Sequence, residues 1–262
     1  MTVQHFNSDG VDIAYIDEGA PTQEPAAEPS KGPILLIHGF ASNFNTNWVA
    51  TGWVSTLVRD GRRVIALDNR GHGQSGKPHD QDAYSPETMA EDARRLLDHL
   101  GIGVADVMGY SMGARITAVL GLNHPNRVRR AVFGGLGINM VRGFDNSDTI
   151  AEALLAPSPD TITDPVGQTF RAFADQTGSD LKALAACIRA SRLKISGAAL
   201  EALRMPVLVC VGTEDDTGGD PHELAAFIPQ GRAVDIEGRD HMKAVGDKTY
   251  KAAVLAFLKE HR

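Results

Sequence analysis

The chain has 262 residues, of which 42% are hydrophobic and 23% are charged, and its formal net charge is −7. This length allows a large core and favours one domain with an elaboration, and the composition is that of an ordinary globular protein. The negative charge argues against a nucleic-acid partner, because the chain supplies no basic field to neutralise phosphates.

Membrane contact, cofactors and metals are also not expected. No apolar run reaches the roughly 18 residues of a spanning helix, and the first residues do not resemble a signal peptide. Cys187 and Cys210 stand outside any CxxC or Cys/His spacing and are predicted to be buried thiols in a reducing compartment. The glycine-rich stretch 67–76 lacks the Gly-Lys-Ser/Thr of a phosphate loop. We expect a cytoplasmic protein, and the sequence leaves its oligomeric state open.

The predicted strands are spread over most of the chain. Two segments before residue 20 predict a β-hairpin that turns at residues 8–10, and residues 20–33, rich in Pro, Ala and Glu, predict an exposed, mobile loop. Six β-rich apolar runs follow and alternate with helical patterns such as 86–100; the runs are 33–39, 62–68, 105–110, 130–135, 206–212 and 232–238. Because these runs are continuously apolar, they predict a parallel sheet that is buried on both faces.

The segment 138–203 breaks this alternation. It contains four short helical patterns, at about 147–156, 164–176, 180–191 and 196–203, and no strand pattern between them. Some 65 residues far exceed an ordinary crossover between parallel strands. We therefore expect an all-helical insertion at 138–203 in a core formed by 1–137 and 204–262.

A serine between two glycines forms the most informative motif. Residues 109–113 read Gly-Tyr-Ser-Met-Gly, between a predicted strand and a predicted helix that ends before Pro125. At a sharp strand-to-helix turn the serine takes a strained backbone conformation, and the residues two positions away must be small. The helix N-terminus also offers backbone amides to an anion. The motif in this context predicts that Ser111 is a nucleophile.

A serine hydroxyl needs a base, and the base needs an acid that orients it. For this type of turn the order along the chain is serine, acid, histidine. The acid should follow the run 206–212, where Asp215 is favoured over its neighbours Asp216 and Glu214. The histidine should follow the last predicted strand, which makes His241 the candidate base among nine histidines.

Two backbone amides are predicted to hold an oxyanion. One is that of Met112, directly after the nucleophile, and the other is that of Phe40, in the turn after the run 33–39. Phe44 and Tyr110 are the candidate substrate-binding residues.

Apolar residues of the insertion are expected to complete a modest pocket over Ser111. Most of them should pack on each other and on the core, while a minority face the serine together with Phe40. The candidates are Leu154, Leu155, Val166, Phe170, Phe173, Leu181, Leu184 and Ile188. No charged cluster offers a partner for an anionic substrate, although Arg142, Arg171 and Arg189 leave that point open.

These motifs together resemble the α/β-hydrolase superfamily. The resemblance runs through "LLIHGF", "ALDNRGHGQS", "GYSMGA", "VLVCVGTEDD" and "GRDHM", and so spans the chain except the helical insertion. It implies an eight-stranded, mostly parallel sheet with helices on both faces and a small helical cap formed by 138–203. A serine at position 111 distinguishes the chain from haloalkane dehalogenases and epoxide hydrolases, which carry aspartate there.

The expected function is hydrolysis of a small-molecule carboxylic ester. Ser111 would attack the ester carbonyl, His241 would take its proton, and Asp215 would orient the imidazole. Esters with short to medium uncharged acyl chains are favoured. The alternatives are a lactonase or a C–C bond hydrolase with the same triad, or a signalling receptor that keeps the fold to bind a ligand.

Overall fold

A computed structural model describes residues 1–19, 31–143, 146–191 and 193–260. Most of the loop predicted at 20–33 lies outside these ranges, and its last residues, from Lys31 on, instead begin a strand. Within the described ranges, no helix combines the length and the apolar character needed to cross a membrane.

One eight-stranded sheet forms the centre of the molecule. Its strands are β1 (Gln4–Ser8), β2 (Val11–Glu18), β3 (Lys31–Ile37), β4 (Arg62–Leu67), β5 (Ala105–Tyr110), β6 (Val128–Gly134), β7 (Val207–Gly212) and β8 (Gly231–Ile236). They are ordered β1-β2-β4-β3-β5-β6-β7-β8. Among the strand pairs of the described residues, β1–β2 and β2–β4 are antiparallel and the other five are parallel. The predicted sheet is thereby confirmed.

The N-terminal hairpin also agrees with the sequence. Ser8 pairs with Val11, and the two residues between them, Asp9 and Gly10, have φ angles of 54° and 86°. Such left-handed conformations suit aspartate and glycine in a tight hairpin turn.

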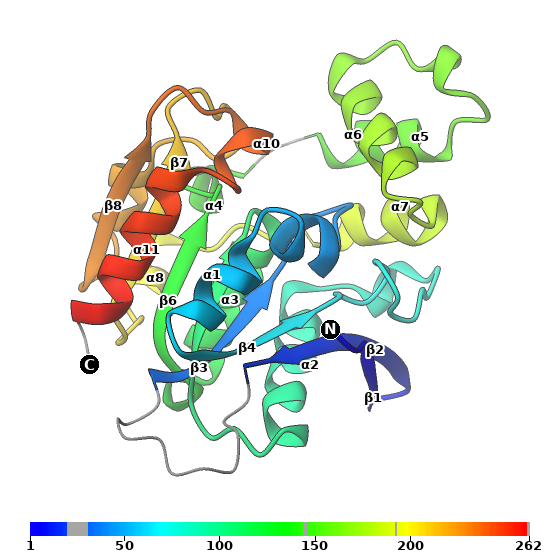
Figure 1. The fold of residues 1–262 in the computed structure, drawn as a ribbon. Helices are drawn as coiled ribbons and strands as arrows, with labels where there is room; N and C mark the ends of the chain where they lie inside the picture. Colours follow the sequence, from blue (N-terminus) through cyan, green and yellow to red (C-terminus); the bar gives the residue numbers. More distant parts are fainter. Residues whose placement is uncertain (20–30, 144–145, 192, 261–262) are drawn as a thin grey trace.

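Helices cover both faces of the sheet (Figure 1). Successive residues of a strand point to opposite faces, and in β3 Leu35 and Ile37 join one buried cluster while Ile34 and Leu36 join the other. The first cluster packs against α2 (Pro86–His99), α3 (Met112–Asn123) and α9 (Pro221–Ala225). The second packs against α1 (Trp53–Arg59) and α11 (Lys248–Glu260). Burial on both faces explains why the strand sequences are continuously apolar.

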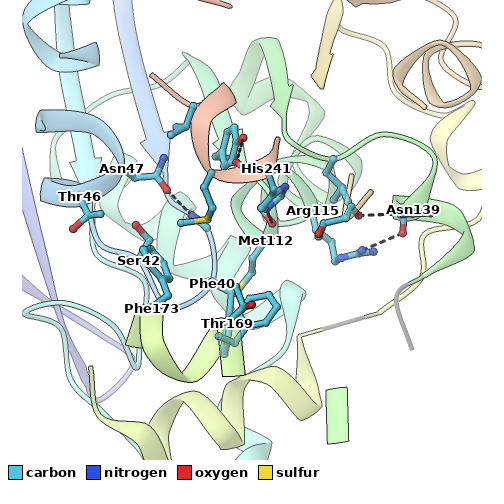
Figure 2. A pocket seen from close by; sticks show the side chains of 18 of the residues that line it. Phe40, Ser42, Thr46, Asn47, Met112, Arg115, Asn139, Thr169, Phe173 and His241 are labelled. Atoms are coloured by element: carbon cyan, nitrogen blue, oxygen red, sulfur yellow. Dashed lines mark hydrogen bonds between the residues drawn. The ribbon is translucent and has the colours of Figure 1, made fainter. Parts of the chain in front are cut away.

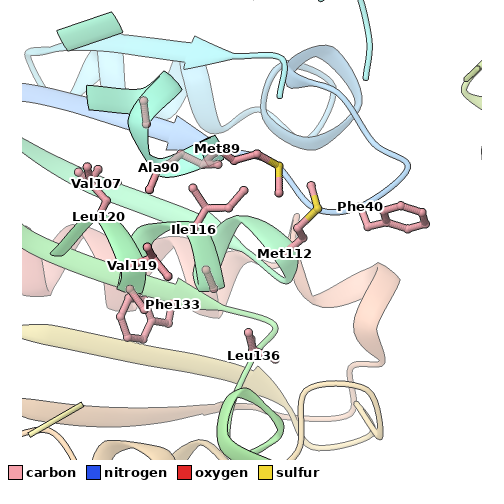
Figure 3. Packing of buried hydrophobic residues seen from close by; sticks show 14 of the residues in the cluster. Phe40, Met89, Ala90, Val107, Met112, Ile116, Val119, Leu120, Phe133 and Leu136 are labelled. Carbon is pink, nitrogen blue, oxygen red and sulfur yellow. The ribbon is translucent and has the colours of Figure 1, made fainter. Parts of the chain in front are cut away.

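The core beneath the predicted nucleophile is densely filled (Figure 3). Ile116, Val119 and Leu120 of α3 lie on the sheet among Val107 of β5 and Phe133 of β6, and all five are buried. Helix α3 is therefore fixed along much of its length, and so is the turn that leads into it.

The described residues between β6 and β7, where the sequence predicts an insertion, form five helices. They are α4 (Asn139–Arg142), α5 (Ser147–Leu155), α6 (Pro165–Gln176), α7 (Leu181–Ala190) and α8 (Gly197–Leu200), with a 3-10 turn η4 at Pro159–Thr161. Asp164, Asp180 and Ser196 accept backbone hydrogen bonds at the starts of α6, α7 and α8, as N-cap residues do. Helix α5 packs against both α6 and α7. In Figure 1 these three helices form a separate green and yellow-green group beside the sheet.

The remaining helices are short. They are the π-helical turn η1 (Asn45–Val49), the 3-10 turns η2 (Gln81–Ala83) and η3 (Pro125–Arg127), and α10 (His241–Ala244). The first and last of them carry side chains of the candidate site.

Candidate active site

The turn between β5 and α3 presents Ser111. Its backbone has φ 54° and ψ −113°, a conformation that costs of order 1–3 kcal/mol and is kept only where the surroundings impose it. A Cβ on Gly109 would lie 2.0 Å from the Gly113 oxygen, and a Cβ on Gly113 would lie 2.0 Å from the Ile37 oxygen. Both glycines are therefore required by backbone contacts, as the motif predicts.

The structure brings Ser111, His241 and Asp215 together. The His241 Nε2 lies 3.0 Å from the Ser111 Oγ, and the His241 Nδ1 lies 2.7 Å from the Asp215 Oδ2. An ionised carboxylate can only accept, so Nδ1 carries the proton and Nε2 is left to accept from the serine hydroxyl. The geometry is that of a nucleophile, a base and an orienting acid.

Asp215 is held more firmly than its acidic neighbours. Its side chain is fully buried, and its second oxygen accepts a hydrogen bond of 2.8 Å from the Gly218 amide. Asp216 lines the cavity described below, and Glu214 is exposed. Of the three acids that the sequence left as candidates, Asp215 is the one placed against His241.

Tyr110 contacts both the main chain and the ring of His241. Its hydroxyl donates a hydrogen bond of 2.6 Å to the main-chain oxygen of His241, and the two rings lie 5.5 Å apart between centroids. Burial and the nearby carboxylate of Asp215 raise the pKa of Tyr110 well above its usual range. The hydroxyl therefore stays protonated and able to donate.

The two predicted oxyanion donors belong to residues that lie near Ser111. Met112 is the first residue of α3, where a backbone amide has no intrahelical acceptor. Phe40 follows β3 by three residues, and its amide donates to no acceptor among the described residues. Both residues line the same cavity as Ser111.

A cavity of about 570 Å³ opens above Ser111. Its apolar lining comprises Phe40, Met112, Leu136, Val166, Phe170, Phe173, Met242 and Val245. Figure 2 shows the polar residues Ser42, Thr46 and Asn47 on the left with Phe173 near them, and Phe40 and Met112 nearer the middle. Arg115 and Asn139 lie at the opposite end of the view. The volume is in the range of small-molecule sites.

Helix α6 forms the apolar part of the cavity wall that comes from the insertion, which also contributes the polar residues Asn139, Asn146 and Ser191. Of the apolar candidates there, Val166, Phe170 and Phe173 line the cavity, and the Phe170 ring lies 5.8 Å from that of Phe40. The other candidates pack elsewhere: Leu154, Leu184 and Ile188 are buried, Leu181 is partly buried, and Leu155 is 47% exposed. This matches the expectation that a minority would face Ser111.

The prediction for Phe44 is wrong, because Phe44 is not among the described residues that line the cavity. Its backbone amide donates to the buried Asp68 carboxylate at 2.7 Å, and its side chain joins the core cluster that contains Trp48. The turn η1 begins directly after Phe44, and the cavity-lining positions of that turn are Thr46 and Asn47.

The three arginines that the sequence left open are engaged with carboxylates. Arg142 pairs with Glu223, Arg171 with Asp175 and Arg189 with Asp148. The cavity instead contains Arg115, which sequence reasoning missed. Its position four residues after Ser111, one turn along α3, is the signal that could have found it.

Arg115 is buried, and its guanidinium donates to the carbonyl oxygens of Met140, Leu193 and Asn139. It therefore ties α3 to the start of the segment between β6 and β7 and to that segment's later part. The described residues contain no group of three or more His, Cys, Asp or Glu side chains that could hold a metal ion.

Buried titratable groups lie behind the Phe40 turn. Burial lowers the pKa of His38 well below its usual range and that of His72 to about 4. Burial also raises the pKa of Asp68 to about 6, although the amides of Phe44 and Gln74 donate to its carboxylate. The two histidine rings lie 5.2 Å apart, and the His72 ring meets that of Phe40 edge-on at 5.8 Å.

Comparison with known proteins supports the same fold. The family model described as the alpha/beta hydrolase fold matches residues 32–156. A solved structure of a hydrolase from Pseudomonas aeruginosa is 28% identical, with a TM-score of 0.73 over 98% of each chain.

The curated relatives match shorter segments. An sn-1-specific diacylglycerol lipase of Mus musculus is 41% identical over 38% of this chain and 31% of its own length. A 2-hydroxymuconate semialdehyde hydrolase of Pseudomonas sp. (strain CF600) is 35% identical over 43% of this chain and 40% of its own length. The matched segments of these two relatives span less than half of their own lengths.

Proposed function

The chain belongs to the α/β-hydrolase superfamily, and we propose that it is a serine hydrolase of carboxylic esters that works through an acyl-enzyme. One observation carries the proposal. Ser111, His241 and Asp215 form a continuous hydrogen-bonded series, and its nucleophilic end opens into a cavity of small-molecule size. The similarity to a diacylglycerol lipase, which is named for an ester substrate, supports the same reaction type.

In the first half of the reaction an ester carbonyl carbon is attacked by the Ser111 Oγ. The hydroxyl proton passes to the His241 Nε2, and the buried Asp215 carboxylate stabilises the imidazolium without taking the proton. The amides of Phe40 and Met112 donate to the tetrahedral oxyanion. When the intermediate collapses, the imidazolium gives its proton to the departing alkoxide, and the alcohol leaves.

In the second half a water molecule attacks the acyl group on Ser111. His241 accepts the proton of that water, a second tetrahedral oxyanion forms at the same amides, and Ser111 leaves as a hydroxyl after reprotonation. The carboxylic acid is released. Each proton taken by the imidazole is returned, so the protein ends in its starting state.

The acyl chain is expected to be short to medium in length. The apolar part of the cavity lining includes three phenylalanine and two methionine side chains, and a volume of about 570 Å³ is far too small for a triglyceride with long chains. The proposed substrate is therefore a small ester with an uncharged acyl group.

A hydrolysis screen tests the proposal. Turnover of p-nitrophenyl esters from acetate to palmitate, with simple lactones added to the panel, should show rapid hydrolysis of the shorter esters. The same screen on Ser111→Ala provides the control, because activity that survives this substitution does not come from the proposed site. Slow single turnover with a change in shape would instead favour a ligand-binding receptor.

A C–C bond hydrolase is the second candidate, and the similarity to a 2-hydroxymuconate semialdehyde hydrolase favours it. Such an enzyme can use the same serine, histidine and aspartate. Purified protein should be given 2-hydroxymuconate semialdehyde and p-nitrophenyl butyrate in parallel. A kcat/KM for the semialdehyde that exceeds the value for the ester would replace the esterase proposal with this second one.

A further inference from the structure

The carbonyl group of Gly39 is held by the histidine that precedes it. His38 follows β3 directly and is fully buried, and its Nδ1 lies 2.7 Å from the Gly39 oxygen. Its Nε2 accepts a hydrogen bond of 3.0 Å from the Asn69 amide. A carbonyl cannot donate and a backbone amide cannot accept, so the ring is neutral with its proton on Nδ1. Burial, which holds the pKa of His38 well below its usual range, keeps it in this form.

This hydrogen bond acts on the proposed oxyanion hole. The carbonyl of Gly39 and the N–H of Phe40 belong to one planar peptide group and point in opposite directions. Fixing the Gly39 oxygen therefore fixes the direction in which the Phe40 amide donates. The loop is close to the nucleophile, because a Cβ on Gly39 would lie 3.4 Å from the Ser111 Cβ.

The preceding peptide is held from a different element. The Gly39 amide donates to the Asn47 Oδ1 at 3.1 Å, and Asn47, in the π-helical turn η1, is only 6% exposed. Figure 2 shows this bond as a dashed line from Asn47 to the loop. With its amide held by Asn47 and its carbonyl by His38, Gly39 has little freedom to rotate about either of its backbone bonds.

We propose that His38 and Asn47 are positioning residues that fix the Gly39–Phe40 peptide, so that the Phe40 amide points at the oxyanion before substrate arrives. This inference rests on the proposed ester hydrolysis, and neither residue is given a contact with substrate. Preorganised donors matter in catalysis because they need no rotation when charge develops on the carbonyl oxygen.

Two substitutions at His38 separate its two hydrogen bonds. The amide of His38→Asn can reach the place of Nδ1 and still donate to the Gly39 oxygen, whereas the amide of His38→Gln can reach the place of Nε2 and keep only the contact with Asn69. We expect kcat for p-nitrophenyl butyrate to fall by roughly 10- to 100-fold in His38→Gln, with KM nearly unchanged. Loss of a whole oxyanion donor costs about 10²–10³-fold, and a misaligned donor costs less. His38→Asn should stay within about fivefold of the wild type.

The thiono analogue of the ester gives a readout that a merely structural role would not move. Its sulfur is a poorer acceptor than oxygen, so the ratio of kcat for the oxo and thiono esters measures how well the amides stabilise the oxyanion. We expect this ratio to shrink in His38→Gln and to be kept in His38→Asn. Thermal unfolding of each variant checks that the protein is folded.

Asn47 is tested by Asn47→Ala, with Asn45→Ala as the matched control. Asn45 lies in the same turn, and its side chain is exposed. Asn47→Ala should lower kcat and the oxo/thiono ratio together, and Asn45→Ala should change neither.

The outcomes distinguish the two proposals. A wild-type kcat and ratio in folded His38→Gln and Asn47→Ala would overturn the positioning roles, and so would equal losses in the two His38 variants with an unchanged ratio. Wild-type protein without Ser111-dependent turnover of any ester would instead overturn the proposed function.

Discussion

The Tyr110 hydroxyl donates a hydrogen bond of 2.6 Å to the main-chain oxygen of His241, so the residue before the proposed nucleophile holds the backbone of the proposed base. The bond joins the end of β5 to the start of α10, and the two bonded residues are 131 apart in the sequence. It stands in addition to the bonds that the imidazole makes with Ser111 and Asp215.

Removal of this hydroxyl should impair catalysis more than substrate binding. A hydrogen bond of this kind contributes about 1–2 kcal/mol, so Tyr110→Phe is expected to lower kcat by roughly 5- to 30-fold with little change in KM. Tyr250→Phe is the matched control, because the Tyr250 hydroxyl is buried and has no partner in the described part of the chain. Equal losses in both variants would mean that the Tyr110–His241 bond has no role in turnover.

The two adjacent aspartates should differ sharply. Asp215→Asn presents an amide to the Nδ1 of His241 and favours the wrong imidazole tautomer, which can cost as much as about 10⁴-fold in kcat. Asp216→Asn should stay within about tenfold of the wild type, because Asp216 lines the cavity and does not bond to the imidazole. Steady-state kinetics on one short ester would decide the point, and the reverse order would show that Asp216 is the acid.

The acyl preference should depend on Phe170. Phe170 belongs to α6, and its ring contacts that of Phe40 at the cavity wall. Phe170→Ala should therefore enlarge the cavity and shift the optimum among p-nitrophenyl esters toward longer chains. Leu155→Ala is the control, since Leu155 is 47% exposed and outside the cavity lining. A wild-type maximum at palmitate, or no shift in Phe170→Ala, would contradict the assignment of α6 as the cavity wall.

Folding stability should depend on pH through His72. Burial lowers its pKa from 6.5 to about 4, so the native state binds fewer protons than the unfolded chain between these values. The contribution of His72 to the free energy of unfolding is full above pH 6.5 and is lost as the pH falls from there through about 4. Between pH 7.5 and 4.5 this loss amounts to about 2–3 kcal/mol.

The effect of His72 is measured by comparing the wild type with His72→Gln, because Asp68 changes the free energy of unfolding with pH in the opposite direction. Its pKa is raised to about 6, so its contribution is present below pH 3.8 and is lost as the pH rises through about 6. Urea unfolding at pH 7.5 and 4.5 should therefore show a smaller loss at acid pH for His72→Gln than for the wild type. Identical losses would show that His72 is not the group responsible.

Much of the fold could be predicted because local sequence signals agree with it. Six strands follow from apolar runs and the first two from a predicted hairpin, and α2 follows from the Ser85 N-cap with Pro86 at the first turn. Ser111, Asp215 and His241 could be placed together because each follows a strand of one parallel sheet, and the carboxyl ends of such strands meet at one edge.

The lining of the cavity could not be predicted in the same way. Thr46 and Asn47 lie in a π-helical turn that no periodic pattern marks, and the same turn places Phe44 in the core instead. Asn139 reaches the cavity because the short α4 docks beside the loop after β7, where its side chain donates to the Thr217 oxygen. Such placements depend on how separate elements pack and not on the pattern within either of them.

The central claim, that Ser111 becomes acylated, is tested most directly by mass spectrometry of the protein quenched during turnover of p-nitrophenyl butyrate. The account predicts a mass increase of one acyl group on the peptide that carries Ser111. In Asp215→Asn the same adduct should form more slowly, and Ser111→Ala should give none. Rapid hydrolysis with no adduct in any variant, or with an adduct on another residue, would contradict it.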